Sequence, residues 1–214
     1  MTEKSIEISI QAPYYTYGEL TPDTRSLWVV CHGYGQLARH FIRRFDVLDP
    51  ARHYVIAPQG LSKYYLPGHQ RVGASWMTKE NRLVEIANYL HYLDAVFEEE
   101  TQAVSLEGKQ LVLMGFSQGV ATIGRWAAYR RVPFDRLILW AGGFPHELKA
   151  GQFPPLKSGA EIVAVVGNED EYLDSPKVEQ QLAFVQQVTG LKPRLITFAG
   201  KHEVKREVLR EVAG

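Results

Sequence analysis

One stretch of this sequence decides the fold, Leu111-Val112-Leu113-Met114-Gly115-Phe116-Ser117-Gln118-Gly119. An apolar run ends in Gly-x-Ser-x-Gly, and apolar residues then recur at helical spacing. In this strand–turn–helix context the pentapeptide is typical of a nucleophile elbow. Because a serine on such a sharp turn has strained backbone geometry, its neighbours Gly115 and Gly119 must be small. The turn also places the Gln118 N–H at a helix N-terminus, where it can stabilise negative charge.

Composition limits the class of protein. The length of 214 residues suits one α/β domain, so we expect residues 1–214 to form a single domain. The 24 basic and 24 acidic residues cancel, which predicts no nucleic-acid partner. No apolar window is long enough for a membrane span, and residues 1–10 lack a signal-peptide core. Cys31 is the only cysteine, which excludes an intrachain disulfide and a cysteine-based zinc site. We expect no metal site, and without a signal peptide or a membrane span we expect a cytoplasmic location.

Strand and helix signals alternate along the chain. Ile6, Ile8 and Ile10 alternate with polar residues, which predicts a half-buried strand with a hairpin partner at 14–20. Residues 58–78 show no period, and we expect a long functional or mobile loop there. Further strands are predicted at 26–31, 54–57, 111–114, 137–140, 162–166 and 195–198, with helical patterns between them. This order predicts a mostly parallel sheet with helices on both faces.

In such a sheet, ligands bind at the carboxyl ends of the strands. Three loops that follow predicted strands carry the candidate chemistry: His32–Gln36, Gly167–Glu171 and Ala199–His202. Together with Ser117 they place a serine, an acid and a histidine in the chain order of an α/β-hydrolase triad.

The roles of these residues follow from their acid–base chemistry. A serine hydroxyl needs a base to remove its proton, and an imidazole can do this near neutral pH. Of the seven histidines, His202 alone follows the last strand just before the last helix, and His146 is the alternative. A carboxylate then orients the imidazole. Asp170 is the predicted acid, and Asp174 in the same loop is the alternative.

An oxyanion hole needs two N–H donors that point at one position. The Gln118 N–H is the first candidate. Tyr34 is the second, because Gly33 and Gly35 allow the backbone between them to turn inward. We expect His32, beside this loop, to hydrogen-bond the loop rather than to react.

These segments resemble the phospholipase/carboxylesterase family of small α/β-hydrolases, which includes acyl-protein thioesterases. The resemblance implies the α/β-hydrolase fold without a large cap domain. It also implies Ser117, Asp170 and His202 as the catalytic triad, with Tyr34 and Gln118 as the oxyanion hole. The matching residues are His32–Gly35, Ala57-Pro58, Gly115–Gly119, Gly167…Asp170 and Gly200…His202.

The sequence departs from the family pattern at three places. Gln36 stands where the family commonly has an acidic residue. Ser75-Trp76-Met77 replaces an aromatic–Asp motif, and Glu171-Tyr172-Leu173 lacks the usual proline after the acid. These changes leave the candidate catalytic residues in place and alter the residues that surround a substrate.

The expected function is that of a serine carboxylesterase. It would hydrolyse short- to medium-chain acyl esters or thioesters through an acyl-serine, without a cofactor, as a monomer or homodimer. A non-catalytic binding protein with this fold and an acyltransferase with the same triad are the alternatives. The residues predicted to bind the substrate are Trp76, Tyr65, Phe144 and Leu173.

Overall fold

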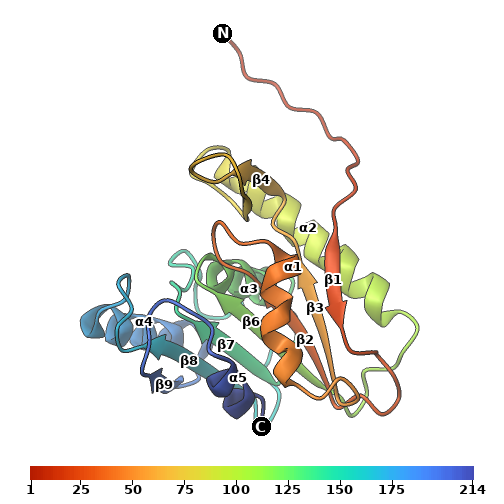
Figure 1. Cartoon of the computed structure of the whole chain (residues 1–214), viewed down its shortest axis with the longest axis vertical. Coiled ribbons are helices and arrows are strands. Elements are labelled where there is room, and N and C mark those ends of the chain that lie inside the picture. Colours follow the sequence, from red (N-terminus) through yellow and green to blue (C-terminus); the bar gives the residue numbers. More distant parts are fainter.

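The computed structural model describes all 214 residues, and its centre is a seven-stranded sheet in the order β1-β3-β2-β6-β7-β8-β9. All neighbouring strands are parallel except β1, which runs antiparallel to β3 (Figure 1). This confirms the predicted mostly parallel sheet. The strands are β1 (Tyr14–Tyr17), β2 (Ser26–Cys31), β3 (His53–Pro58), β6 (Gln110–Phe116), β7 (Arg136–Trp140), β8 (Glu161–Gly167) and β9 (Arg194–Phe198).

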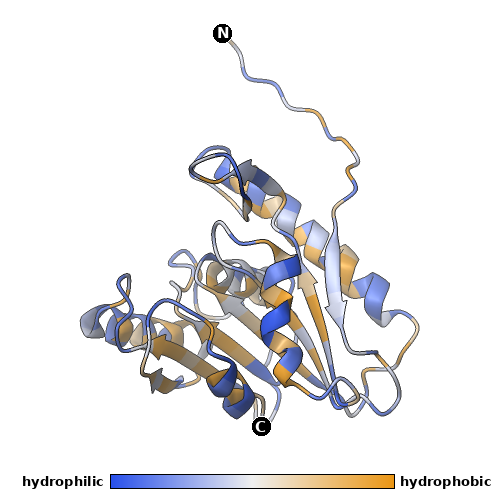
Figure 2. Ribbon diagram, in the orientation of Figure 1, coloured by the Kyte–Doolittle hydropathy of each residue, from blue (hydrophilic) through white to orange (hydrophobic).

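Helices cover both faces of this sheet, because successive side chains of a strand point to opposite faces. In β2, Leu27 and Val29 pack in the core under α2 (Arg82–Thr101), α3 (Gln118–Tyr129) and α4 (Ser175–Thr189). Trp28 and Val30 pack in the second core under α1 (Ala38–Phe41), the 3₁₀ helix η1 (Ile42–Val47) and α5 (Arg206–Ala213). The inner strands β3, β7 and β8 are mainly hydrophobic, whereas β1 is not, and the helices combine hydrophobic and hydrophilic residues (Figure 2). No helix has the length and apolar character needed to cross a membrane.

The predicted strand at Ile6, Ile8 and Ile10 is wrong. Residues 1–13 contain no strand, and the chain leads away from the domain at its N-terminus (Figure 1). The three isoleucines are 87%, 75% and 62% exposed. Tyr14–Tyr17 does form a strand, but its partner is β3 rather than residues 6–10. Alternation defines the two faces of an extended segment but does not supply a partner for its backbone.

The region predicted as an unpatterned loop, residues 58–78, contains a β-hairpin. Strand β4 (Ser62–Tyr65) pairs antiparallel with β5 (Val72–Ser75) in a separate two-stranded sheet. The hairpin is anchored by backbone hydrogen bonds from the Gly35 N–H to the Ala74 carbonyl (2.8 Å) and from the Ala74 N–H to the Gln36 carbonyl (3.2 Å). The hairpin therefore lies against the loop that follows β2.

The parallel register brings the candidate loops to one edge of the sheet. Cys31 pairs with Gly115, Phe116 with Trp140, and Gly167 with Phe198. Strand β2 has β3 on one side and β6 on the other, so the chain reverses its direction of winding at this point. Ligands in open α/β sheets bind at such switch points.

Three glycines allow the elements to meet at this edge. A Cβ atom on Gly115 would overlap the Gly119 carbonyl oxygen, and one on Gly119 would overlap the Cys31 carbonyl oxygen. A Cβ on Gly142, after β7, would overlap the Ser117 carbonyl oxygen. Helix α3 can approach β2 and β7 this closely only because these positions lack side chains.

Replacing Gly119 tests this close approach. Gly119→Ala should lower the free energy of unfolding by about 3 kcal/mol, because the added methyl group meets backbone atoms that cannot rotate away. Gly143→Ala is the matched control, since no atom lies within 4 Å of its added Cβ. Urea unfolding of both variants measures the difference. Equal stability of the two variants would show that the junction has more room than the structure indicates.

Candidate active site

Ser117 occupies a strained turn between β6 and α3. Its backbone dihedrals are φ 53° and ψ −118°, a positive φ that is uncommon outside glycine. The turn is held by hydrogen bonds from the Ser117 N–H to the Trp140 carbonyl (2.9 Å) and from the Val120 N–H to the Ser117 carbonyl (3.0 Å). The serine thus lies at the carboxyl end of the central strand, as the Gly-x-Ser-x-Gly motif predicts.

Asp170 and His202 form a hydrogen-bonded pair at the same edge. His202 Nδ1 lies 2.8 Å from Asp170 Oδ2, and the Asp170 side chain is fully buried. The other carboxylate oxygen, Oδ1, accepts the Tyr172 N–H at 2.9 Å. Since an ionised carboxylate only accepts hydrogen bonds, the imidazole donates from Nδ1, which leaves Nε2 of a neutral ring as an acceptor.

The two alternative residues lie elsewhere. Asp174 caps α4 by accepting the Lys177 N–H at 3.0 Å, and its side chain is 58% exposed. This hydrogen bond lowers the pKa of its carboxyl group. His146 is 90% exposed and lies beside Glu147. Neither alternative forms a hydrogen bond or an ion pair with Asp170 or His202.

The His202 ring lies between two aromatic residues. The Phe116 ring, one residue before Ser117, is 4.9 Å away between ring centroids, and the Tyr172 ring is 4.7 Å away in an edge-on arrangement. The imidazole is therefore adjacent to the elbow and only 16% exposed. The one side-chain hydrogen bond of His202 is to Asp170, and none joins it to Ser117. Such contacts often form only when substrate is bound.

In the loop after β2, the Tyr34 N–H is unpaired between hydrogen-bonded neighbours. The Gly33 N–H donates to Gln36 Oε1 (2.9 Å), the Gly35 N–H to the Ala74 carbonyl and the Gln36 N–H to the Gly33 carbonyl. The Tyr34 N–H makes no hydrogen bond, and neither does the N–H of Gln118 at the start of α3. The loop lies against the elbow, since a Cβ on Gly33 would be 3.2 Å from Ser117 Cβ. The two predicted donors are thus unpaired.

His32 supports this loop from inside, as expected. Its Nδ1 lies 2.8 Å from the Gly33 carbonyl oxygen, and its Nε2 accepts the Gly60 N–H at 2.9 Å. Because a backbone N–H can only donate, the ring proton must be on Nδ1. Burial lowers the pKa of His32 to about 4, so the ring is neutral at physiological pH.

The Gln118 side chain connects the elbow to the residues after β5. Its Oε1 accepts the Trp76 N–H at 3.0 Å, and its Nε2 donates to the Met77 carbonyl at 2.8 Å. The Trp76 indole N–H in turn donates to the His32 carbonyl at 2.8 Å. One side chain therefore fixes the end of the hairpin relative to both candidate oxyanion donors.

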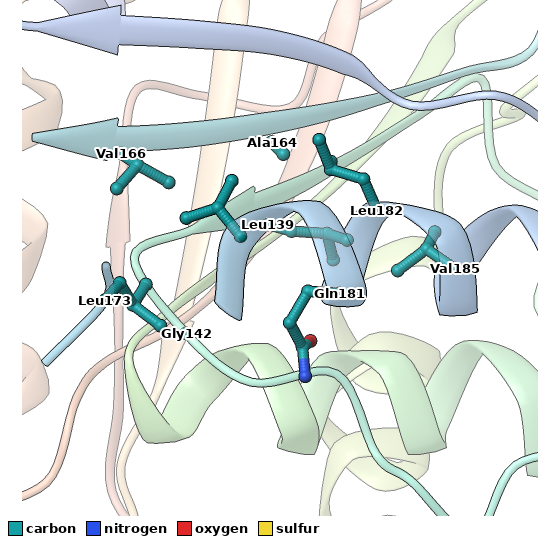
Figure 3. Close-up of a pocket in the computed structure, with 9 residues that line it drawn as sticks. Leu139, Gly142, Ala164, Val166, Leu173, Gln181, Leu182 and Val185 are labelled. Atoms are coloured by element: carbon teal, nitrogen blue, oxygen red, sulfur yellow. The ribbon is translucent and has the colours of Figure 1, made fainter. Parts of the chain in front are cut away.

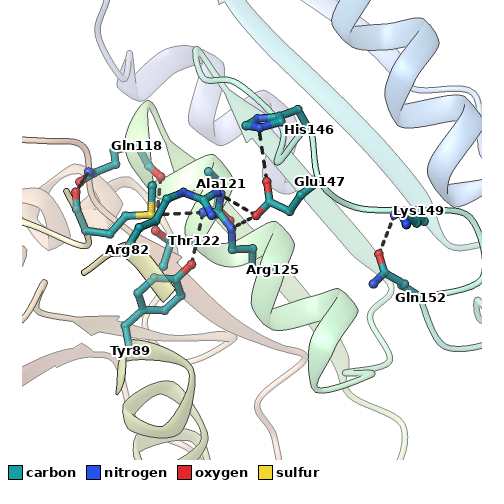
Figure 4. A network of polar contacts seen from close by, with 11 residues as sticks. Arg82, Tyr89, Gln118, Ala121, Thr122, Arg125, His146, Glu147, Lys149 and Gln152 are labelled. Carbon is teal, nitrogen blue, oxygen red and sulfur yellow. Dashed lines mark hydrogen bonds and ion pairs between the residues drawn. The ribbon is translucent and has the colours of Figure 1, made fainter. Parts of the chain in front are cut away.

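An ionic network centred on the buried Arg125 contacts the same segment (Figure 4). Arg125 on α3 donates from Nε to Glu147 Oε1 (2.6 Å), which also accepts from Arg82 (3.1 Å). Arg125 also contacts the Tyr89 hydroxyl and the Met77 sulfur. Burial alone would raise the pKa of Glu147, but the hydrogen bonds from Arg125, the backbone and Arg82, with the Arg125 charge, together outweigh it and lower the pKa to about 2.

Sequence reasoning missed this network and the role of the Gln118 side chain. The available signal was Arg125 itself, a charged residue among the apolar positions of α3. A charge at such a position requires a buried partner. The sequence did not identify that partner, because Glu147 lies in a loop 22 residues away.

The four predicted substrate-binding residues have different environments. Trp76 is 1% exposed and stacks on His32, and Phe144 is 3% exposed and stacks on Phe153 in the core. Tyr65 is 65% exposed on β4. Leu173, which follows the Asp170 loop, lines an apolar cavity between β7, β8 and α4. The structure contains no group of three or more His, Cys, Asp or Glu residues arranged to hold a metal ion.

Comparison with solved structures identifies the fold. Acyl-protein thioesterase 2 from Zea mays superposes with a TM-score of 0.71 at 12% identity, covering 94% of this chain and 96% of that one. The phospholipase/carboxylesterase from Dyadobacter fermentans gives 0.64 at 18% identity and 96% coverage of both chains. Esterase PE8 gives 0.61 at 18% identity, covering 96% of this chain and 100% of that one.

No protein-family model matches the sequence, and no curated protein matches it either. The three similar structures are an acyl-protein thioesterase, a phospholipase/carboxylesterase and an esterase, the kinds of protein that the sequence motifs resemble. At this level of identity the likeness establishes the fold. The chain has the α/β-hydrolase fold, and no cap domain is inserted into it.

The buried neutral His32 makes stability dependent on pH. Its pKa is about 4 in the folded chain and 6.5 for an accessible ring, so the unfolded chain binds this proton first as the pH falls. The contribution of the neutral His32 ring to the free energy of unfolding is fully present above pH 6.5 and is lost toward pH 4. Between pH 7 and pH 5 the loss should be about 2 kcal/mol. Urea unfolding at both values measures it.

His32→Gln is the control for this prediction. The variant should be less stable at pH 7, because the loop loses its internal support. Its further loss between pH 7 and pH 5 should be about 2 kcal/mol smaller than that of the native chain. An identical pH dependence in both proteins would contradict the assignment.

Proposed function

We propose that the protein is a serine carboxylesterase of the phospholipase/carboxylesterase family. It hydrolyses short- to medium-chain acyl esters or thioesters through an acyl-serine intermediate. The observation that carries this proposal is the buried Asp170–His202 pair beside the strained Ser117 turn. A carboxylate-bound imidazole next to a serine at a strand end is the arrangement that activates a hydroxyl for acyl transfer.

In the first step, Ser117 Oγ attacks the carbonyl carbon of the substrate, and its proton passes to His202 Nε2. The π electrons of the carbonyl bond move to its oxygen, which becomes an anion. The unpaired N–H groups of Tyr34 and Gln118 stabilise this anion, and α3 adds the positive end of its dipole. Both donors are held in place before the reaction, by His32 and by the Gln118 side chain.

The second half returns the proton. His202 gives it to the leaving alkoxide or thiolate as the carbon–oxygen or carbon–sulfur bond breaks, which leaves Ser117 acylated. Water then loses a proton to His202 as its oxygen attacks the acyl carbon. The bond from that carbon to Ser117 Oγ breaks, His202 returns the proton to Oγ, and a carboxylic acid is released. Asp170 stabilises the imidazolium that forms in each step. The reaction needs only these side chains and water, and the buried thiol of Cys31 is compatible with the reducing cytoplasm.

Replacing the nucleophile tests the proposal directly. Ser117→Ala should reduce kcat for p-nitrophenyl acetate by about 10⁶-fold, because the members of a triad act as a unit. His202→Ala should cost about as much. The decisive control is labelling with a fluorophosphonate probe, which requires an activated serine. The native chain should be labelled at Ser117, and the Ser117→Ala variant should remain unlabelled.

The same experiment distinguishes the alternatives. A folded native chain that neither hydrolyses p-nitrophenyl esters nor reacts with the probe is a binding protein rather than an enzyme. Formation of a new ester in the presence of added alcohol, in preference to the free acid, identifies an acyltransferase.

Tyr172 provides a second test, since its ring contacts the His202 imidazole. An aromatic contact of this kind is worth about 1 kcal/mol, or roughly a fivefold change in rate. Tyr172→Ala should therefore lower kcat about fivefold, while the backbone N–H bond to Asp170 remains. Tyr172→Phe keeps the ring and should retain native kcat. Steady-state kinetics with p-nitrophenyl acetate measure kcat for both variants. Full activity of Tyr172→Ala would show that the Tyr172 ring does not position His202.

A further inference from the structure

An apolar cavity lies between the carboxyl-terminal halves of β7 and β8 and helix α4 (Figure 3). Seven of its nine lining residues are hydrophobic. Leu139, Ala164 and Val185 form its buried inner wall, being 5%, 7% and 1% exposed. Leu173 and Gly142 lie together at the opposite end from Val185. The cavity is therefore closed on the sheet side and bordered by two loops at its other end.

These two loops are the ones that hold the candidate catalytic residues. Gly142 packs so closely on the elbow that a Cβ there would overlap the Ser117 carbonyl oxygen. Leu173 follows Asp170 in the loop after β8, three positions along the chain. The cavity thus ends at the loop that packs on the Ser117 backbone and at the loop that carries Asp170.

The single polar side chain in the cavity wall is bonded within the protein through its oxygen. Gln181 on α4 accepts the Phe144 N–H through Oε1 at 2.6 Å, which ties the loop after β7 to the helix. The rest of the lining is apolar apart from Gly142. A cavity of this lining favours an aliphatic group, because burying an unpaired polar group there is costly.

The volume of the cavity sets the size of that group. It measures about 30 Å³. One water needs roughly 10–15 Å³ on this scale, so the space holds about two to three groups of water or methylene size. A longer chain would have to displace the inner wall or leave the cavity.

We infer that this cavity is the acyl pocket of the enzyme and that it selects short aliphatic acyl groups of about two to four carbons. The inference rests on the proposed function, since it places the acyl chain of the Ser117 intermediate. It narrows the substrate class from short- and medium-chain esters to short-chain ones. It also assigns chain-length selection to β7, β8 and α4 rather than to the hairpin at residues 62–75.

A series of p-nitrophenyl esters from acetate to octanoate tests the inference. For the native chain, kcat/KM should be highest from acetate to butyrate and at least about tenfold lower for hexanoate, because one methylene too many in an apolar pocket costs about that much. A native preference for octanoate would overturn the inference.

Two variants change the volume in opposite directions. Leu182→Ala removes three carbons from the α4 wall and should raise the hexanoate-to-butyrate ratio of kcat/KM about tenfold. Ala164→Val adds two methyl groups to the inner wall and should lower the butyrate-to-acetate ratio about tenfold. The ratio of kcat/KM for two esters, measured on one protein sample, does not depend on the fraction of that sample that is folded. If Ala164→Val does not fold, the result with Leu182→Ala decides.

Val188→Ala is the matched control. Val188 lies on the same helix and is 4% exposed in the core, but it does not line the cavity. Its truncation also removes apolar packing from α4 and should leave both ratios unchanged. If both cavity variants keep the native kcat/KM ratios, the cavity is not the acyl pocket. Acetate hydrolysis that depends on Ser117 would still uphold the proposed function in that case. If no ester is hydrolysed and Ser117 is not labelled, the proposed function itself fails.

Discussion

The rest of the structure depends on the contact between backbone atoms at the β6–α3 junction. Gly115, Gly119 and Gly142 leave no room for side chains there, so β2, β7 and α3 approach Ser117 through their main chains. The hydrogen bond from the Ser117 N–H to the Trp140 carbonyl joins the turn to the neighbouring strand. Strands β2, β6 and β7 and helix α3 are thus fixed around Ser117, and they enforce its positive φ. The serine is held in a conformation that it would not adopt alone.

The parallel sheet turns this local constraint into a site. Since the carboxyl ends of β2, β6, β8 and β9 meet at one edge, loops far apart in the sequence become neighbours. Asp170 and His202 are 32 residues apart and hydrogen-bond across β8 and β9. The sequence was informative about this arrangement because strand order and loop chemistry are both local signals. Each apolar run, and the residue type that follows it, can be recognised without knowledge of its partners.

The errors have the opposite origin, because they concern partners and directions. The alternation at residues 6–10 was real, but no strand edge receives it. The burial of Trp76 and Phe144 in the core was likewise not evident from the sequence, because an aromatic residue in a loop can point either way. The hairpin at residues 62–75 depends on hydrogen bonds to the loop after β2, which no short window of sequence reports. Arg125 needed a partner, and only the fold supplies Glu147.

The two sides of the site differ in how they are built. On the β2 side, polar groups are paired in a continuous set of bonds from His32 through Trp76 and Gln118, and the ion pair of Arg125 lies beneath them. Such a network tolerates little displacement, because each broken bond leaves a buried polar group unpaired. On the β7–β8–α4 side, the contacts are apolar and a cavity remains. Dispersion contacts have no fixed direction, so side chains there can change size without unpairing anything. Rigid placement of charge-stabilising donors and adjustable accommodation of an aliphatic chain are different physical tasks, and the proposed mechanism uses the paired polar side for the first and the apolar side for the second.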